Sequence, residues 1–270
     1  MDILKSKFIN EVSKLCTNMY RLGWDERNGG NVSYILDEEE VSKYLNLENV
    51  IRSYPNNLIY DNLDNKLFLI TGTGKYFKNV EDNPIENLGI IRINNQNKSI
   101  DLLWGFSDGG KFTSELPAHL MSHNARLYQD VNHKVVIHTH PTNLVAMTMV
   151  HKLEDSSFTK SLWCTCTECM VVFPDGIGVL PWMLCGNDEI GLATAKKMKD
   201  YRLVVWSLHG IYGTGRTIDE AFGLIETVEK AAQLYMLTAN LNVINTISDQ
   251  QLVEIANHFK VDYKKEFFDK

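Results

Sequence analysis

The chain has 270 residues and a formal net charge of −7, and 44% of its residues are hydrophobic. This apolar content is enough for a substantial buried core, so we expect a globular protein. The acidic balance, without any run of Lys and Arg between aromatic residues, argues against a nucleic-acid-binding surface. No segment approaches the ~20 apolar residues of a membrane span, and no apolar stretch typical of a signal peptide opens the chain. We therefore expect a cytoplasmic protein with a small-molecule partner, no nucleic acid and no membrane.

The first half of the chain predicts one helix followed by short strands. Apolar residues at helical spacing, up to Leu22, predict a helix over residues 2–22, and Gly23 is well suited to terminate it. Four strand-like runs follow, at residues 31–36, 67–71, 88–93 and 100–104. The stretch 37–65 is rich in Asn, Asp and Glu, which predicts a surface excursion. A further helix is expected to begin near Ser114.

The second half again mixes strands and helices. A strand is predicted at Val135 and a helix after Pro141, and the apolar run 203–206 predicts another buried strand. Three helix starts are predicted from capping residues: Asn187, Thr217 with Glu220, and Ser248 with Gln251. Without repeats or a clear linker, the pattern indicates one domain over residues 1–270 of class α/β. We predict a three-layer α/β/α sandwich around a central mixed, largely antiparallel sheet.

Two histidines one residue apart, His138 and His140, close the apolar run 135–137. Residues i and i+2 of a strand project from the same face, so both imidazoles can reach one ion. A catalytic Zn²⁺ site needs three protein ligands and one open position. His209 follows the second apolar run and is the best candidate for the third ligand. The alternative is that a lone histidine after a strand is an ordinary hydrogen-bonded residue.

Three of the five cysteines are clustered at Cys164, Cys166 and Cys169. Because five is an odd number and no export signal is evident, we expect free thiols. The cluster offers a possible structural zinc site, but no second C-x-x-C or nearby histidine completes a set of four ligands. Packing thiols are therefore favoured.

Three further segments have groups that suit an anion. The turn Asn28, Gly29, Gly30, Asn31 and the loop Thr71 to Lys75 each combine paired glycines with polar groups, which permits close approach of the backbone to a phosphate. Ser114 lies at a predicted helix N-terminus, which is a natural anion site. Taken singly, each loop is better explained as an ordinary turn, and Glu115 as a carboxylate that stabilises the helix dipole.

Taken together, these segments resemble the class II, zinc-dependent sugar-phosphate aldolases. The resemblance spans nearly the whole chain, in seven segments: GWDERNGGN (23–31), TGTGK (71–75), TSELPAH (113–119), HTHPTN (138–143), TECMVVFPDG (167–176), PWMLCGNDEIG (181–191) and LHGIYGTG (208–215). It implies one Zn²⁺ per chain held by His138, His140 and His209, with Glu115 as the catalytic glutamate. It also implies a homotetramer with active sites near subunit boundaries.

The resemblance further assigns the phosphate-binding groups to six residues: Asn28, Gly29, Asn31, Thr73, Gly74 and Ser114. A serine is common in the family at the position of Thr73, which keeps the hydroxyl and adds a methyl group. Glu168 is a second candidate for proton transfer, at the aldehyde end of the substrate and across a subunit boundary, or else a structural carboxylate.

Within the family, the segments are most similar to the branch that cleaves L-rhamnulose 1-phosphate to dihydroxyacetone phosphate and L-lactaldehyde. An L-fuculose-1-phosphate aldolase or a pentulose-5-phosphate 4-epimerase would share the zinc site and the phosphate loops. A metal-binding relative without activity is disfavoured, since a binding module has no use for Glu115 beside an open metal position.

Overall fold

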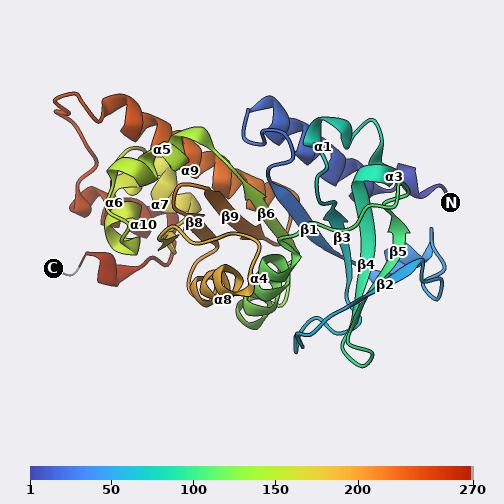
Figure 1. Ribbon diagram of the computed structural model, residues 1–270. Helices are drawn as coiled ribbons and strands as arrows, with labels where there is room; N and C mark the ends of the chain where they lie inside the picture. Colours follow the sequence, from blue (N-terminus) through green and yellow to red (C-terminus); the bar gives the residue numbers. More distant parts are fainter. Residues whose placement is uncertain (269–270) are drawn as a thin grey trace.

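A nine-stranded sheet forms the centre of the protein (Figure 1). The computed structural model describes residues 1–268. The strand order is β2-β5-β4-β3-β1-β6-β9-β8-β7, and all neighbouring strands are antiparallel except β7 and β8. The strands are β1 Asn31–Leu36, β2 Arg52–Pro55, β3 Leu67–Thr71, β4 Leu88–Asn94, β5 Ser99–Gly105, β6 Val135–Thr139, β7 Gly178–Leu180, β8 Leu203–Trp206 and β9 Gly210–Gly215.

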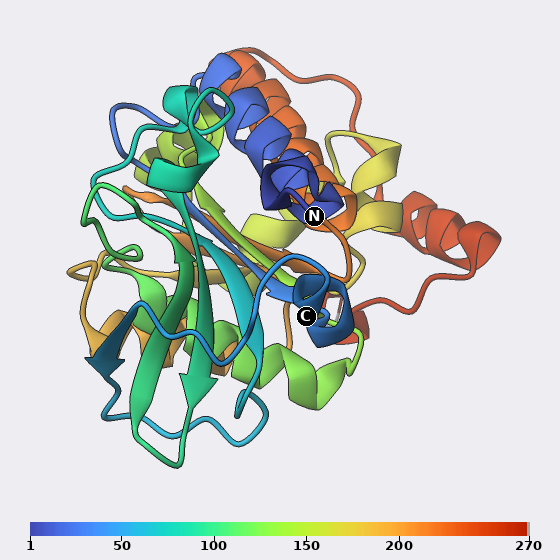
Figure 2. The same cartoon turned by 90° about the vertical axis from the view of Figure 1, so that its right-hand side faces the viewer.

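Helices cover both faces of this sheet, which confirms the three-layer α/β/α sandwich (Figure 2). The larger apolar cluster joins one face to α1, α5, α6, α7, α9 and α10, and the opposite face packs against α4 and α8. The helices are α1 Lys7–Arg21, α2 Glu38–Ser42, α3 Pro84–Asn87, α4 Leu116–Gln129, α5 Thr142–Val150, α6 Asp155–Trp163, α7 Thr167–Val172, α8 Asp188–Lys197, α9 Ile218–Thr238 and α10 Asp249–Phe259. No helix in the described residues is long and apolar enough to span a membrane.

The capping predictions are largely confirmed. Asn187 accepts a hydrogen bond from the Ile190 N–H at the start of α8, and Ser248 with Gln251 forms a complete capping box at α10. At α9 the box is half formed: Thr217 accepts from the Glu220 N–H, but the Glu220 carboxylate accepts from the N–H of Arg216. Gly23 has a φ of +75° just after α1, as expected for a helix terminator.

Two predictions of local structure are wrong. The stretch 37–65 is not a plain surface excursion, because it contains α2 and the edge strand β2 and buries Val41 and Leu63. These two apolar side chains hold the polar segment against the core. Leu22 lies beyond the last residue of α1 and is 48% exposed, so it does not belong to the apolar face of that helix.

The register of the sheet places three polar side chains in one row. Asn31 at the start of β1 pairs with His138 near the end of β6, and His138 pairs with Tyr212 in β9. Residues directly opposite each other on antiparallel strands project from the same face. The helix α4 covers this face, and Glu115 immediately precedes it. The strands therefore bring together residues that lie far apart in the sequence.

Candidate active site

His138, His140 and His209 converge at the end of β6. Each offers a ring nitrogen, and these three ligand atoms all lie within 4.8 Å of one another. The Nε2 atoms of His138 and His140 are 3.3 Å apart, and the His209 ring centroid lies 5.0 Å from each of the other two. His209 comes from the short connection between β8 and β9. The geometry thus brings together the three histidines that the sequence predicts as metal ligands.

Hydrogen bonds orient two of these rings. His138 Nδ1–H donates to the carbonyl oxygen of Ile211 at 3.1 Å, which leaves the Nε2 lone pair free. His140 Nδ1–H donates to the Glu26 carboxylate, also at 3.1 Å, and so presents its Nε2 as well. Burial lowers the pKa of His138 well below its ordinary value and lowers that of His209. Neutral imidazoles with free lone pairs are what metal coordination requires.

Two glycines allow His140 to occupy its position. A Cβ on Gly29 would lie 2.8 Å from Cε1 of His140, and a Cβ on Gly210 would lie 2.7 Å from Cδ2 of the same ring and 2.4 Å from the Thr139 carbonyl oxygen. Any side chain at either position would displace the ring or the backbone of β6. The lack of a side chain at Gly29 and Gly210 therefore leaves room for His140 in the candidate metal site.

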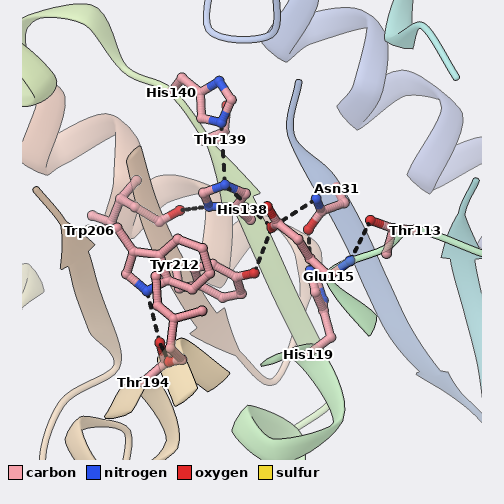
Figure 3. Close-up of polar contacts among 12 residues, drawn as sticks. Asn31, Thr113, Glu115, His119, His138, Thr139, His140, Thr194, Trp206 and Tyr212 are labelled. Atoms are coloured by element: carbon pink, nitrogen blue, oxygen red, sulfur yellow. Dashed lines mark hydrogen bonds and ion pairs between the residues drawn. The ribbon is translucent and has the colours of Figure 1, made fainter. Parts of the chain in front are cut away.

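Glu115 lies beside the histidines, held by two donors. Its Oε2 accepts from the Tyr212 hydroxyl at 2.8 Å and from Asn31 Nδ2 at 3.1 Å, and lies 3.5 Å from His138 Nε2 (Figure 3). Burial raises the pKa of Tyr212 well above its ordinary value, so the hydroxyl stays protonated and donates. Both of these bonds go to Oε2, which leaves Oε1 for chemistry.

The donor set fits a divalent transition-metal ion. Three imidazole nitrogens with a carboxylate beside them match the ligands of catalytic zinc sites, in which a fourth position stays open. Among the described residues, a second possible group consists of Glu115, Cys185 and His209, and it overlaps the first. The cysteine cluster contributes to neither group. Cys169 is buried in the core, with Cys164 and Cys166 packed against it, as expected of packing thiols.

Comparison with known proteins identifies the family. Residues 10–236 match the family described as "Class II Aldolase and Adducin N-terminal domain". The chain belongs to the class II aldolase family.

Curated members of the class II aldolase family align with nearly the full chain. A rhamnulose-1-phosphate aldolase of Listeria monocytogenes serotype 4a (strain HCC23) is 52% identical over 264 residues, which cover 97% of each chain. One from Enterococcus faecalis (strain ATCC 700802 / V583) is also 52% identical, over 98% of this chain and 95% of that one. One from Yersinia pseudotuberculosis serotype O:1b is 45% identical over 96% of both.

Solved structures of similar fold include a sugar-phosphate aldolase from Thermotoga maritima. It has a TM-score of 0.75 and 28% identity, covering 87% of this chain and 96% of that one. An L-fuculose 1-phosphate aldolase has a TM-score of 0.62 and 21% identity, covering 95% and 97%. These structures agree with the mixed, largely antiparallel sheet observed here, and at 21% identity the likeness concerns the fold alone.

The three predicted phosphate segments meet at the same end of the sheet as the histidines. Thr113 N–H donates to the Thr71 carbonyl oxygen at 3.0 Å, and Val32 N–H donates to the Thr71 hydroxyl at 3.0 Å. This joins the segments that carry the six predicted residues: Asn28, Gly29, Asn31, Thr73, Gly74 and Ser114. The side chains among them differ in exposure, since Asn28, Thr73 and Ser114 are exposed whereas Asn31 is 6% exposed.

Glu168 is not brought to this site within one chain. It is exposed on the first turn of α7, a helix that packs against α6, α9 and α10. Among the described residues, no hydrogen bond or ion pair joins it to Glu115 or to the histidines. Its predicted catalytic role therefore requires a neighbouring subunit.

Sequence reasoning missed two residues that shape the site. Tyr212 donates to Glu115 and stacks on His138, with ring centroids 4.5 Å apart at 24°. Glu26 orients His140. The signal for both was their presence inside segments already singled out, LHGIYGTG and GWDERNGGN. Their roles depend on strand register and loop packing, which the sequence alone does not specify.

Proposed function

We propose that this class II aldolase reversibly cleaves L-rhamnulose 1-phosphate to dihydroxyacetone phosphate and L-lactaldehyde. The observation that carries the proposal is 52% identity along 97% of both chains to a rhamnulose-1-phosphate aldolase. The convergence of three histidines and Glu115 at one end of the sheet supports it, because these residues suit a metal-assisted reaction.

Breaking the carbon–carbon bond leaves an enediolate, whose negative charge must be stabilised. A bound Zn²⁺ supplies a Lewis acid for that charge. The three histidines would hold the ion as neutral ligands and would leave its full positive charge available. We propose that Glu115 moves a proton at the enediolate carbon. The hydrogen bonds from Tyr212 and Asn31 to Oε2 support this role for Oε1, since they leave it uncommitted.

The phosphate group of the substrate is proposed to bind the three segments at this end of the sheet. Asn28, Thr73 and Ser114 offer exposed polar side chains for it. The backbone N–H groups of Gly29 and Thr73 already donate to the carbonyl oxygens of Glu26 and Lys111. Their contributions are therefore close backbone approach at Gly29 and the side-chain hydroxyl at Thr73. Binding energy from this remote group then orients the reacting carbon.

Glu168 is proposed to act in the active site of a neighbouring subunit of a homotetramer, near the aldehyde end of the substrate. Exposed apolar side chains support a subunit contact beside the site. Trp182 and Leu184 are each 63% exposed, and Cys185 next to them lies within 4.8 Å of the ligand atoms of Glu115 and His209. Exposed apolar residues gathered beside a site suit a protein interface.

We further propose zinc as the metal, one domain for the whole chain, and a cytoplasmic location. Three imidazoles with an open fourth position are a common catalytic zinc arrangement. One sheet extends from β2 to β7, which suits a single domain. All five cysteines are free thiols, which suits a reducing compartment, and a phosphorylated sugar does not readily cross a membrane.

The test is a product assay on purified enzyme with L-rhamnulose 1-phosphate, before and after a chelator and again after Zn²⁺ is restored. We expect dihydroxyacetone phosphate to form, to stop forming with the chelator, and to reappear with zinc. L-Fuculose 1-phosphate and L-ribulose 5-phosphate are assayed alongside. A higher kcat/KM for L-fuculose 1-phosphate, or epimerisation of the pentulose at a comparable rate, would assign the chain to one of those activities instead.

A further inference from the structure

A chain of buried hydrogen bonds leads away from Glu115 along the interface of α4 and β1. Asn31 donates from Nδ2 to Glu115, and its Oδ1 is hydrogen-bonded to His119 Nε2. Ser33 Oγ bridges His119 Nδ1 and His123 Nε2, at 2.6 and 2.7 Å. The last link joins His123 Nδ1 to His133 Nε2 at 2.8 Å. We call this set of six residues the α4–β1 chain: Glu115, Asn31, His119, Ser33, His123 and His133.

The α4–β1 chain forms because the spacing of residues along a strand matches the spacing along a helix. Residues 31 and 33 of β1 project from one face and lie about 6.6 Å apart along the strand. Residues 119 and 123 are four apart on α4, a spacing of about 6 Å along the helix axis. These two spacings match, so His119 and His123 lie abreast of Asn31 and Ser33. Glu115, one turn before His119, then reaches the end of the row beside His138.

Every donor in the chain points toward Glu115. A carboxylate only accepts, so the amide of Asn31 presents its NH₂ group to Glu115 and its oxygen to His119. His119 must then carry its proton on Nε2, which makes its Nδ1 an acceptor for the Ser33 hydroxyl. Ser33 in turn accepts from His123 Nε2–H, and His123 Nδ1 accepts from His133 Nε2–H. One carboxylate therefore determines the tautomers of three histidines.

Water does not compete for these bonds. Ser33, His119 and His123 are 0% exposed, and His133 is 3% exposed. Burial lowers the pKa of His119 to about 4 and that of His133 to about 3, so both rings are neutral at pH 7. Aligned hydrogen bonds in a dry interior polarise one another, and each is held more firmly than it would be alone. Such a chain can hold one side chain in a fixed orientation.

We propose that His119 is a positioning residue for Glu115, acting through Asn31 and held in turn by Ser33, His123 and His133. The inference rests on the proposed function, in which Glu115 moves a proton. His119 is fully buried and touches Asn31, so it acts on Glu115 without reaching the substrate. Loss of His119 leaves Asn31 Oδ1 without its buried partner, so the Asn31 side chain is no longer fixed in its rotamer and its hydrogen bond to Glu115 weakens.

The first experiment replaces His119 by Phe, which keeps a buried ring but removes both nitrogens. We expect kcat for cleavage to fall about 10- to 100-fold, the scale of a misplaced catalytic group. KM, calorimetric affinity for dihydroxyacetone phosphate and zinc content should stay within about twofold of wild type. His119→Gln keeps one donor and one acceptor and should recover part of kcat. A kcat of His119→Phe near that of wild type would overturn the inference.

A matched pair of serines separates positioning from loss of packing. Ser33 and Ser122 are both 0% exposed, and Ser122 lies on α4 between His119 and His123. The Ser122 hydroxyl has no hydrogen-bond partner among the described residues, whereas Ser33 joins two histidines. Ser33→Ala should lower kcat, and Ser122→Ala should leave it unchanged. Equal losses in both variants would mean that packing is responsible and would refute the proposal.

A third readout does not depend on activity. Ring-nitrogen NMR of the ¹⁵N-histidine-labelled protein should show the Nε2–H tautomer for His119, His123 and His133, and Ser33→Ala should shift the Nδ1 signal of His119. An Nδ1–H tautomer at any of these three histidines would contradict the proposed hydrogen-bond directions in the α4–β1 chain. If the wild-type enzyme fails to cleave L-rhamnulose 1-phosphate, the proposed function fails. The NMR spectrum still tests the hydrogen bonds of the α4–β1 chain. If wild type cleaves and His119→Phe is unaffected, only the positioning role fails.

Discussion

The buried histidines of α4 and the adjoining loop should make the protein sensitive to mild acid. Burial lowers the pKa of His119 to about 4 and of His133 to about 3, and it places that of His123 well below its ordinary value. In the unfolded chain these imidazoles titrate near ~6.5. Below that pH the unfolded state binds protons that the folded state does not bind. The free energy of unfolding therefore falls as the pH falls below ~6.5. The contribution of these histidines to stability is fully present only above that pH.

The size of the effect follows from the linkage relation. Each histidine that stays neutral in the fold costs about 1.4 kcal/mol per pH unit below ~6.5, or about 2 kcal/mol between pH 6.5 and 5. His119 and His133 together cost about 4 kcal/mol, a large part of the 5–15 kcal/mol typical of folded proteins, and His123 acts in the same direction. Near His133, the positive charge of Arg126 further lowers the pKa and the negative charge of Asp130 opposes it. Neither neighbour reverses the downward shift of the His133 pKa.

Urea unfolding between pH 7 and pH 5, at one protein concentration and with a chelator present, measures this dependence. His133→Gln removes one buried imidazole, so the loss of unfolding free energy between pH 7 and pH 5 should be smaller than that of wild type by about 2 kcal/mol, with a slope difference that approaches about 1.4 kcal/mol per unit below pH 6. His258→Gln replaces an exposed histidine and is the control, with the wild-type slope expected. Equal slopes for His133→Gln and wild type would show that His133 is not held neutral in the fold.

Three further predictions concern the active site. Replacing any one of the three predicted ligand histidines by Ala should remove most bound metal and nearly all cleavage, as measured by metal analysis and product assay. The control variants Cys164→Ser and Cys166→Ser should keep one ion per chain. Normal metal occupancy and turnover in a histidine variant would exclude that histidine as a ligand. Glu115→Gln should keep metal and phosphate affinity but lose roughly 10²-fold or more in kcat; turnover near wild type would move the proton-transfer role elsewhere. Asn28→Ala and Thr73→Val should mainly weaken binding of dihydroxyacetone phosphate in calorimetry, and unchanged affinity would place the phosphate elsewhere.

Much of the fold was predictable because local signals agree with the tertiary structure. The runs 31–36 and 67–71 coincide with β1 and β3. Strand β3, LFLIT, is an apolar run, and β1, NVSYIL, contains β-branched and aromatic residues; both patterns are typical of strands. Strand β9 carried no such signal. Its sequence GIYGTG is half glycine, which is unfavourable for a strand in isolation. Pairing with β6 and β8 on both sides stabilises it in the fold.

The sequence predicts the candidate metal site more readily than the hydrogen bonds that hold Glu115 beside it. His138 and His140 are two residues apart on one strand, so their convergence needs only the geometry of a strand. The partnership of Asn31 with His119 needs the packing of α4 across β1, over 88 positions of sequence. Histidines at i and i+4 on a helix predict only a shared face. The row of hydrogen bonds becomes visible when the strand beneath that face is known.

The structure also adds a second role to one of the residues that the sequence predicts to bind phosphate. The amide of Asn31 has two N–H donors and one oxygen. Its oxygen bonds His119 and one N–H bonds Glu115, so a single N–H remains for a phosphate. A change at Asn31 therefore disturbs positioning and substrate binding together. Asn28 is exposed and is not a member of the α4–β1 chain, whereas His119 is fully buried within it. We therefore expect Asn28→Ala mainly to raise KM and His119→Phe mainly to lower kcat, which would distinguish binding of the phosphate from orientation of Glu115.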